Sequence, residues 1–340
     1  MTIMQLNSII NLKLTQESGQ TSQPPWKVKD TSYCDMVEID NTPVLLKVQQ
    51  NGIEHLNLEY ELPIANQNIS IDKPSTNKVA IDKKVIDNEI INEIAIKNEV
   101  TRIFDLEFDI DKFYNYLSLD EKLKPAIDFC RGLRLFLAKD PFEAMVSSIA
   151  SANNSIARWT KSIAKIREKW GNPIDFPSGT FYSFPTPTRL MSVYEDDFEE
   201  YEARGRSIEI ECCNKNLKAC GVGYRAPYMK KTSEIISIEN NLHELANMKY
   251  EEAFETVLSL PGVGPKVADC ILLYGYGFRE SFPSDVWIKR IISHLYFNDK
   301  DISVEKVRDF GMEQYGNYAG YVQLYLFHYA RKSGLMKKLK

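Results

Sequence analysis

The chain has 340 residues, of which 44% are hydrophobic and 26% are charged, a balance typical of a soluble protein with a sizeable core in two or three compact units. No apolar run approaches the roughly eighteen residues that suggest a membrane span, and residues 1–14 lack the basic start and apolar block of a secretory signal. The net charge of −5 argues against a protein that binds nucleic acid through its overall charge.

Charge is nevertheless distributed unevenly along the chain. The segment Lys215–Lys231 holds five basic residues and no acid, whereas Glu195–Glu202 holds six acids and no base. This pattern predicts one face that meets a polyanion and another that faces solvent. The six cysteines show no C-x-x-C spacing and none follows Cys270, which indicates reduced thiols and leaves no four-cysteine iron–sulfur loop near the end of the chain.

Residues 1–60 predict a small antiparallel sheet. Three runs are rich in β-forming residues, namely Tyr33–Ile39, Val44–Val48 and Glu54–Tyr60. Asn51-Gly52 between the last two runs is a strong hairpin signal. In the third run apolar and polar residues alternate, as in a sheet with one solvated face. We therefore expect an N-terminal β-rich domain over residues 1–101.

Residues 61–101 differ from the rest of this domain in composition. Ile, Asn, Asp and Lys dominate, and no aromatic residue occurs between Glu61 and Thr101. Without aromatic side chains to anchor it, this stretch is expected to be a variable insertion, or an extra strand or helix at the periphery, and not part of the core.

From residue 102 to residue 340 the pattern is helical. Asp140-Pro141 combines an N-cap with a proline in the first turn of a helix. We therefore predict an α+β fold class, with a small N-terminal antiparallel β-sheet domain followed by a mainly α-helical body. The predicted helices are Asp111–Tyr116, Pro141–Ser151, Ser155–Trp170, Ser207–Ala219, Ala226–Ile236, Tyr250–Leu258, Lys266–Tyr274, Val286–Leu295, Ser303–Tyr315 and Tyr318–Ser333.

The stretch from Leu260 to Asp285 carries the strongest motif. It predicts a helix-hairpin-helix at about residues 251–275, with Gly262, Val263 and Gly264 in the hairpin and Lys266 at the mouth of the second helix. The glycines permit positive φ and leave the backbone amides open to a phosphate. An amine followed by a carboxylate, Asp285, suits Schiff-base chemistry at a sugar carbon. Taken singly, the hairpin is equally well a non-catalytic turn, and Asp285 equally well a helix cap.

The segment from Leu260 to Arg290 resembles the helix-hairpin-helix, Gly/Pro-rich, aspartate superfamily of DNA repair glycosylases. Within it, L-P-G-V-G-P-K-V-A-D-C is most similar to the 8-oxoguanine DNA glycosylases. The resemblance implies that a lysine at position 266 marks a bifunctional member, and the missing cysteine loop argues against the endonuclease III and adenine glycosylase branches. It covers residues 102 to about 333 nearly continuously, and residues before 60 only in fragments.

Two further motifs resemble loops with which this family contacts DNA. A-N-N-S-I-A-R at residues 152–158 implies that Asn153 fills the gap left by a flipped nucleotide and that Arg158 reads the orphaned cytosine. G-V-G-Y-R-A at residues 221–226 implies that Tyr224 enters the duplex and that Arg225 donates to the same cytosine. A polar helix cap and an ordinary turn are the alternatives for these motifs taken alone.

A third group of residues would recognise the flipped base. Gln323 and Phe327 lie four residues apart and so share one helical face, where an amide reads a base edge and a ring stacks on it; a plain core helix is the alternative. The resemblance places Cys270 on the other side of the base. It also implies that the carbonyl of Gly19, in Ser18-Gly19-Gln20, accepts the N7–H that only the oxidised purine carries.

The resemblance thus implies a bifunctional DNA glycosylase and AP lyase that flips out and excises 8-oxoguanine opposite cytosine. Lys266 would attack C1′ as the base leaves, Asp285 would stabilise the developing charge or orient the lysine, and the Schiff base would permit β-elimination. We expect no cofactor, at most a monovalent cation at the hairpin carbonyls, and a monomer that binds double-stranded DNA containing an oxidised purine and no membrane. The expected location is the cytoplasm, at the nucleoid, in a prokaryote, or the nucleus in a eukaryote.

Two other functions stay open on the sequence. A non-catalytic DNA-binding protein could use the same hairpin, and a related glycosylase could remove another damaged base, such as an alkylated one. The chain also departs from the family pattern in three places, one of which is Ser155 in place of a third asparagine. Trp287 stands where animal members carry a phosphate-contacting histidine, and the segment Thr21–Trp26 after Gly19 differs from the usual aromatic and Arg-Trp pair.

Overall fold

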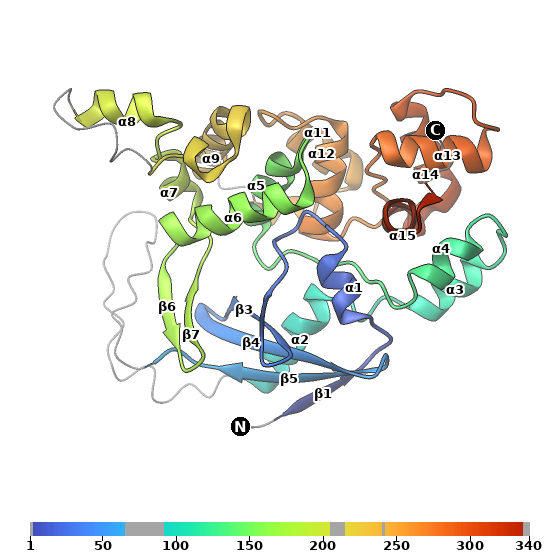
Figure 1. The fold of residues 1–340 in the computed structure, drawn as a ribbon, viewed down its shortest axis with the longest axis horizontal. Coiled ribbons are helices and arrows are strands. Elements are labelled where there is room, and N and C mark those ends of the chain that lie inside the picture. The colour runs from blue at the N-terminus through green and yellow to red at the C-terminus, as the bar shows by residue number, and fades with distance from the viewer. Residues whose placement is uncertain (1–2, 65–91, 205–214, 240–241, 336–340) are drawn as a thin grey trace.

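The computed structural model describes residues 3–64, 92–204, 215–239 and 242–335, which form an N-terminal sheet on one side of a helical body (Figure 1). All neighbouring strands of this sheet are antiparallel, in the order β1-β5-β4-β3-β2. The strands are β1 (Met4–Asn7), β2 (Lys27–Lys29), β3 (Ser32–Ile39), β4 (Thr42–Asn51) and β5 (His55–Glu61), and the short helix α1 (Leu12–Glu17) lies between β1 and β2 in the chain.

The three expected strands are confirmed as β3, β4 and β5. The turn between β4 and β5 contains Gly52 at φ +72°, a left-handed conformation that glycine adopts without a Cβ penalty. In β5, Leu56 and Leu58 are fully buried while the polar residues between them are partly exposed. The predicted alternation of a buried and a solvated face is therefore correct.

The expectation of a peripheral insertion is wrong for its C-terminal part. Helix α2 (Glu93–Ile103) packs against the sheet, and its residues Ile96, Val100 and Ile103 are fully buried in the core of the N-terminal domain. Aliphatic residues at helical spacing anchor this segment without any aromatic side chain. The helix also runs across the domain boundary expected between residues 101 and 102. Residues 65–91 of the expected insertion lie outside the described residues.

The body of the protein is helical, as predicted. In the described ranges no helix has both the length and the apolar character needed to span a bilayer. The α-helices are α3 (Ile110–Leu117), α4 (Lys124–Phe129), α5 (Pro141–Ser151), α6 (Ile156–Trp170), α7 (Pro187–Met191), α8 (Asp197–Arg204), α9 (Ala226–Glu239), α10 (Leu242–Leu245), α11 (Tyr250–Leu258), α12 (Pro265–Cys270), α13 (Val286–Tyr296), α14 (Val304–Tyr315) and α15 (Ala319–Lys332).

Short elements complete the body. A two-stranded hairpin, β6 (Pro173–Phe176) and β7 (Gly179–Tyr182), packs against β3 of the large sheet. Three short 3₁₀ turns are η2 (Lys218–Cys220), η3 (Gly223–Arg225) and η5 (Gly316–Tyr318), and η4 (Ile271–Tyr276) is a π-helical continuation of α12.

One predicted helix is tested only at its end. Most of the expected helix Ser207–Ala219 falls in residues 205–214, outside the described residues. Its remainder contains no α-helix, because the chain bends into η2 and reaches Gly221 at φ +90°. Tertiary contacts decide such a short polar segment more than its helix propensity does.

The helices form two hydrophobic cores that meet at α12. One core contains buried residues of α5, α6, α9 and α11, together with Val267 and Ala268 of α12. The other contains buried residues of α3, α4, α13, α14 and α15, together with Cys270 and, from η4, Leu273 and Tyr274. In Figure 1 the first group occupies the centre and left of the helical layer, and the second group the right. The segment from α12 to η4 therefore contributes to both cores.

The predicted separation of charge is wrong where the structure describes it. Lys218 pairs with Asp196 and Lys230 pairs with Glu199, so two residues of the basic stretch contact the acidic stretch that was expected to face solvent. Lys231 pairs with Glu234 on its own helix. The acidic and basic stretches thus compensate each other at these pairs instead of forming opposite faces.

A buried ion cluster joins the sheet to the helical body. Asp35 on β3 pairs with Lys139 at 2.6 Å and with Arg167 of α6 at 2.9 Å, and Arg167 also pairs with Glu143 of α5. These side chains are between 0% and 13% exposed. Burial alone would raise the pKa of Asp35, but Arg167 and Lys139 outweigh it and hold the pKa below its ordinary value. The cluster therefore favours the docked arrangement of sheet and helices only while its charges stay matched.

Removing Arg167 should destabilise the protein strongly. Arg167→Met would leave Asp35 and Glu143 buried beside too little positive charge, and we expect the free energy of unfolding to fall by about 3–5 kcal/mol. Urea unfolding near neutral pH measures this loss. Because folding lowers the pKa of Asp35, the difference from wild type should shrink as the pH falls through the acid range and Asp35 is protonated. The control is Arg189→Met on the exposed face of α7, with an expected change within about 0.5 kcal/mol; equal effects of the two variants would contradict the role of the cluster.

Candidate active site

The predicted hairpin connects α11 to α12. Gly262 lies at φ +78°, Gly264 is the N-cap of α12, and Pro265 occupies the first turn, where its missing N–H costs nothing. Val263 between the glycines is buried in the core. Lys266 follows on the first turn of α12 and is half-buried. The helix-hairpin-helix predicted at about residues 251–275 is confirmed as α11, this hairpin, and α12 with η4.

Helix α12 is six residues long and is held by its neighbours. Asp269 is fully buried, and its carboxylate accepts from Arg308 of α14 at 2.7 Å and from the Tyr250 hydroxyl of α11. Arg308 in turn lies over the ring of Phe254, 4.2 Å from its centroid. Because so short a helix closes few hydrogen bonds of its own, these contacts determine how α12 is rotated and where Lys266 points.

Cys270 lies one turn after Lys266 and is 3% exposed. Its thiol is within hydrogen-bonding reach of both Lys266 and Thr21. Burial raises the pKa of the Cys270 thiol, and Lys266 and Thr21 only partly offset this effect. The thiol is therefore protonated near neutral pH and is a poor nucleophile.

The π-helical turn places Tyr274 next to Gln323 of α15. The buried Tyr274 hydroxyl donates to the amide oxygen of Gln323 at 3.3 Å, and the amide nitrogen of Gln323 donates to the carbonyl of Pro283 at 2.9 Å. Burial, and then Cys270 and Asp285, raise the pKa of Tyr274. Tyr274 therefore stays a donor and holds the Gln323 amide in one orientation.

Asp285 is the N-cap of α13, as one of its two predicted roles requires. Its Oδ1 accepts from the backbone N–H groups of Trp287 and Ile288, each at 2.9 Å, and among the described residues its Oδ2 has no hydrogen-bond donor. The cap fixes the carboxylate at the positive end of the α13 dipole. One oxygen is thus anchored while the other is available, so capping and catalysis are compatible for this residue.

Phe327 and Gly19 are brought together through a residue that we did not predict, Arg331. Phe327 is partly buried, and the guanidinium of Arg331 lies over its ring at 5.0 Å from the centroid. Arg331 also donates to the carbonyl of Ser18 at 2.9 Å. Gly19 lies at φ +88°, and a Cβ there would come within 2.1 Å of Ile156 and 3.3 Å of Arg331. The backbone at Gly19 is thus packed closely between α6 and α15.

The loop before α6 is exposed where the sequence predicts DNA contact. Asn153 is exposed at φ +47°, a left-handed conformation that asparagine tolerates better than most residues. Arg158, on the first turn of α6, is also exposed. Both predicted contact residues are therefore accessible to a partner.

The two residues predicted from the loop before α9, Tyr224 and Arg225, differ in their exposure to solvent. Tyr224 is 57% exposed, but Arg225 is 7% exposed and donates to the backbone carbonyls of Ala152, Asn153 and Val222. The guanidinium of Arg225 also lies 4.3 Å from the Tyr224 ring centroid. In this conformation Arg225 anchors the Asn153 loop and is not a free donor, which differs from the expected cytosine contact.

A tyrosine missed in the sequence connects this loop to the hairpin. Tyr228 on the first turn of α9 covers Gly262, where an added Cβ would lie 2.7 Å from the Cβ of Tyr228. The rings of Tyr224 and Tyr228 meet edge to face at 6.5 Å. The predicted DNA-contact residues Asn153, Tyr224 and Gly262 are therefore joined by side-chain contacts through Arg225 and Tyr228.

Two site residues that were not predicted, Tyr274 and Arg331, have a weak signal in the sequence, namely their spacing from predicted residues. Tyr274 continues the four-residue spacing of Lys266 and Cys270, and Arg331 continues that of Gln323 and Phe327. Such spacing marks one face of a helix. Thr21 offers no comparable signal, because its contact with Cys270 joins residues far apart in the sequence.

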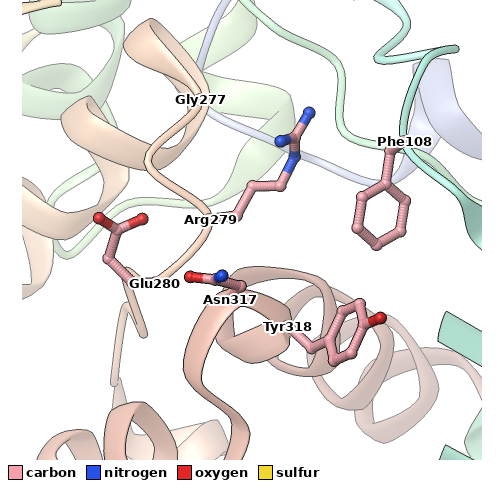
Figure 2. Close-up of a pocket in the computed structure, with 6 residues that line it drawn as sticks. All are labelled: Phe108, Gly277, Arg279, Glu280, Asn317 and Tyr318. Carbon is pink, nitrogen blue, oxygen red and sulfur yellow. The ribbon is translucent and has the colours of Figure 1, made fainter. Parts of the chain in front are cut away.

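A pocket of about 400 Å³ lies beside the start of α15 (Figure 2). None of the predicted site residues lines it; its lining residues are Phe108, Gly277, Arg279, Glu280, Asn317 and Tyr318. Arg279 in its wall donates to Asp105 at 3.2 Å and lies over the ring of Phe108 at 5.3 Å, so its charge is already paired within the protein.

The described residues contain no cluster of three His, Cys, Asp or Glu side chains that could hold a metal ion. A monovalent cation at the hairpin carbonyls stays a prediction.

Comparison with known proteins agrees with this geometry. The profile of the HhH-GPD superfamily base excision DNA repair proteins matches residues 146–315, and that of the 8-oxoguanine DNA glycosylase N-terminal domain matches residues 3–145. The chain is 40% identical over 334 residues to a "Probable N-glycosylase/DNA lyase" of Methanothermobacter thermautotrophicus, an alignment that covers 97% of this chain and 96% of that protein.

Two solved structures have the same fold. The Clostridium acetobutylicum 8-oxoguanine glycosylase/lyase, in complex with double-stranded DNA containing cytosine opposite 8-oxoG, superposes with a TM-score of 0.73 at 28% identity over 98% of this chain and 99% of that one. The 3-methyladenine DNA glycosylase of Archaeoglobus fulgidus superposes with a TM-score of 0.72 at 22% identity, over 98% and 99% of the two chains. The second similarity shows the fold alone. On the family profiles and the 40% identical relative, the chain belongs to the HhH-GPD superfamily of base excision DNA repair proteins and carries the N-terminal domain of the 8-oxoguanine DNA glycosylases.

Proposed function

We propose that this protein flips out and excises 8-oxoguanine opposite cytosine and then nicks the strand as a lyase. The glycosylase and lyase class of the activity follows from its family, and the proposal adds the base, its partner and the residues. The observation that carries it is the position of Lys266 on the first turn of α12, directly after the hairpin and one turn before the buried Cys270. This arrangement supports an amine nucleophile without a competing thiolate.

The proposed chemistry proceeds through a covalent enzyme–sugar bond. The nitrogen of Lys266 forms a bond to C1′ while the bond from C1′ to the base breaks and the base leaves with the electron pair. The free oxygen of Asp285 faces the positive charge that develops on the sugar, and its other oxygen stays on the α13 cap. The sugar ring of this adduct then opens: the nitrogen loses a proton, the C1′–O4′ bond breaks, O4′ takes up a proton and a Schiff base forms. Loss of a C2′ proton from the Schiff base breaks the bond between C3′ and oxygen and expels the 3′ phosphate by β-elimination. A monomer is sufficient for all these steps.

The proposed base reader is the Gln323 amide. An amide group carries two N–H donors and two acceptor lone pairs. Within the described residues Gln323 uses one donor on Pro283 and one lone pair on Tyr274. One donor and one acceptor remain for the edge of a flipped base, while Phe327 stacks on its face and Cys270 lies opposite. The carbonyl of Gly19 is proposed as the acceptor for N7–H, which would reject guanine because guanine presents a lone pair there.

The proposed reading of the opposite strand involves Asn153, Arg158 and Tyr224, all of which are exposed. Arg225 would have to release the carbonyls of Ala152 and Asn153 before it could donate to cytosine. We propose that duplex binding supplies this exchange, because the acceptors of the estranged base replace the loop carbonyls that Arg225 gives up.

The two hairpin glycines support phosphate binding in different ways. Gly264 has no atom within 4 Å of where a Cβ would lie, so its backbone is open to a phosphate. Gly262 has a positive φ, and its Cβ position is filled by Tyr228. One glycine therefore provides access for DNA, and the other allows the turn itself.

The nucleophile can be tested by borohydride trapping on a duplex that contains 8-oxoguanine opposite cytosine. Wild type should form a covalent adduct, and Lys266→Gln should form none because it has no amine. Lys231→Gln, which removes an exposed, ion-paired lysine, is the matched control and should trap like wild type. An equal adduct with Lys266→Gln would show that another amine attacks. Binding by wild type without base release or adduct would favour a non-catalytic DNA-binding protein.

The substrate base can be tested by excision from a panel of duplexes. We expect release of 8-oxoguanine, slower release when cytosine is replaced by another opposite base, and no release of unmodified guanine. Preferred release of an alkylated base such as 3-methyladenine would contradict the proposal and favour a glycosylase for another lesion. The alkylated base is included in the panel because the 3-methyladenine DNA glycosylase of A. fulgidus has the same fold.

Alanine at the two hairpin glycines should separate folding from DNA binding. Gly262→Ala forces a left-handed alanine against Tyr228, so we expect a loss of about 1–3 kcal/mol in unfolding free energy together with weaker binding. Gly264→Ala should leave stability within about 0.5 kcal/mol of wild type and still weaken binding roughly tenfold, because its methyl group occupies the open space. Urea unfolding and fluorescence anisotropy with labelled duplex measure the two quantities. Equal stability of both variants would contradict the assigned roles.

A further inference from the structure

Arg331 connects elements that are far apart in the sequence. It lies on the last turn of α15, four residues after Phe327, and its guanidinium lies over the Phe327 ring at 5.0 Å. One of its terminal nitrogens donates to the backbone carbonyl of Ser18 at 2.9 Å, across 313 positions of the chain. The negative charge of Asp285 also acts on Arg331. One side chain thus contacts the C-terminal helix and the N-terminal domain, close to the carboxylate at the start of α13.

The segment that Arg331 holds has little freedom of its own. Ser18 is fully buried and its hydroxyl donates to Thr15, while Gly19 takes a positive φ against Ile156. Thr21, two residues further, contacts Ser148 of α5 at 2.9 Å and reaches the thiol of Cys270. Arg331 therefore ties α15 to a rigid loop that already touches the proposed catalytic helix.

We propose that Arg331 is a positioning residue for the flipped base: it sets the spacing between the Ser18-Gly19 backbone and the Phe327 ring. This inference rests on the proposed function, in which Gly19 reads the edge of an oxidised purine and Phe327 stacks on its face. A purine fits only if the edge reader and the stacking ring are held at a constant distance. Arg331 contacts the Phe327 ring and the carbonyl of Ser18, the residue before Gly19.

The chemistry of arginine suits this double contact. A guanidinium is planar, so it can lie over an aromatic ring while its in-plane N–H groups donate sideways to a carbonyl. A lysine ammonium in the same place would keep the charge but could not combine the flat contact with the directed hydrogen bond. The neighbouring Lys332 is exposed and makes neither contact, which makes it a matched control for charge.

The test compares base release with strand cleavage. Single-turnover rates are measured for wild type, Arg331→Gln, Arg331→Lys and Lys332→Gln on two duplexes, one with 8-oxoguanine opposite cytosine and one with an abasic site at the same position. The abasic duplex requires Lys266 but offers no base to position. Thermal unfolding of each variant reports folding, and if Arg331→Gln does not fold, Arg331→Lys decides the outcome by the same two rates.

We expect Arg331→Gln to slow base release roughly 10- to 100-fold, the cost of misplacing a reactant by about an ångström, while the abasic duplex is cleaved at the wild-type rate. Arg331→Lys should be intermediate on the base and unchanged on the abasic duplex, and Lys332→Gln should match wild type on both.

Three results would overturn the inference. An equal loss on both duplexes would mean that Arg331 acts through Asp285 or through the fold. Faster base release by Arg331→Gln would mean that the arginine blocks the pocket, and unchanged release would mean that it has no role. If wild type releases a different base, the proposed function is wrong, but the same comparison on that base still tests Arg331.

Discussion

The structure depends on holding a six-residue helix in place. Helix α12 is too short to be stable alone, yet it carries Lys266 and Cys270. It is held because one part of the segment packs in each helical core and because Asp269 is buried against Arg308 and Tyr250. Asp269 and Cys270 are neighbours in the chain, so the ion pair that fixes the helix also fixes the thiol. The hairpin before α12 and the π-helical turn after it inherit the same orientation.

The N-terminal domain is part of this site and not only an attachment to it. Thr21 reaches Cys270, and Ser18 and Gly19 lie against Arg331 and α6. These contacts place the loop after α1 opposite the two helices that carry Lys266 and Phe327. The buried cluster of Asp35, Lys139, Arg167 and Glu143 holds the two parts of the molecule together. A change that loosens this cluster would therefore act on the site without touching it.

Local patterns predicted much of the fold. The alternation in β5, the Asn51-Gly52 turn and the cap at Asp140 are nearest-neighbour effects, and each has its expected place in the structure. The strands at both edges of the sheet were missed because β1 and β2 are short, four and three residues. Helix α2 was misjudged because its composition is polar overall while its buried residues are few and aliphatic.

The site was predictable where chemistry follows a motif, and not where it follows from distant contacts. The hairpin glycines, Lys266 and the two alternative roles of Asp285 could be read from local sequence. The inward orientation of Arg225 could not, because it depends on carbonyls some 72 and 73 residues away. Charge pairing between the acidic and basic stretches was missed for the same reason, since the sequence shows where acids and bases lie along the chain and not which of them form pairs.

The proposed site has two halves, one that reads the base and one that acts on the sugar. Burial keeps the Cys270 thiol and the Tyr274 hydroxyl neutral, so the groups that would surround the base carry no charge. Lys266 and Asp285, the groups proposed to attack and to stabilise the sugar, lie next to them. A neutral pocket suits an uncharged purine, because burying a charge without a partner would cost more free energy than contacts with the base would supply. Lys266 and Asp285 act only where the sugar becomes positive and the amine attacks. Separating the two halves over a few side chains allows one site both to read a base and to break its bond.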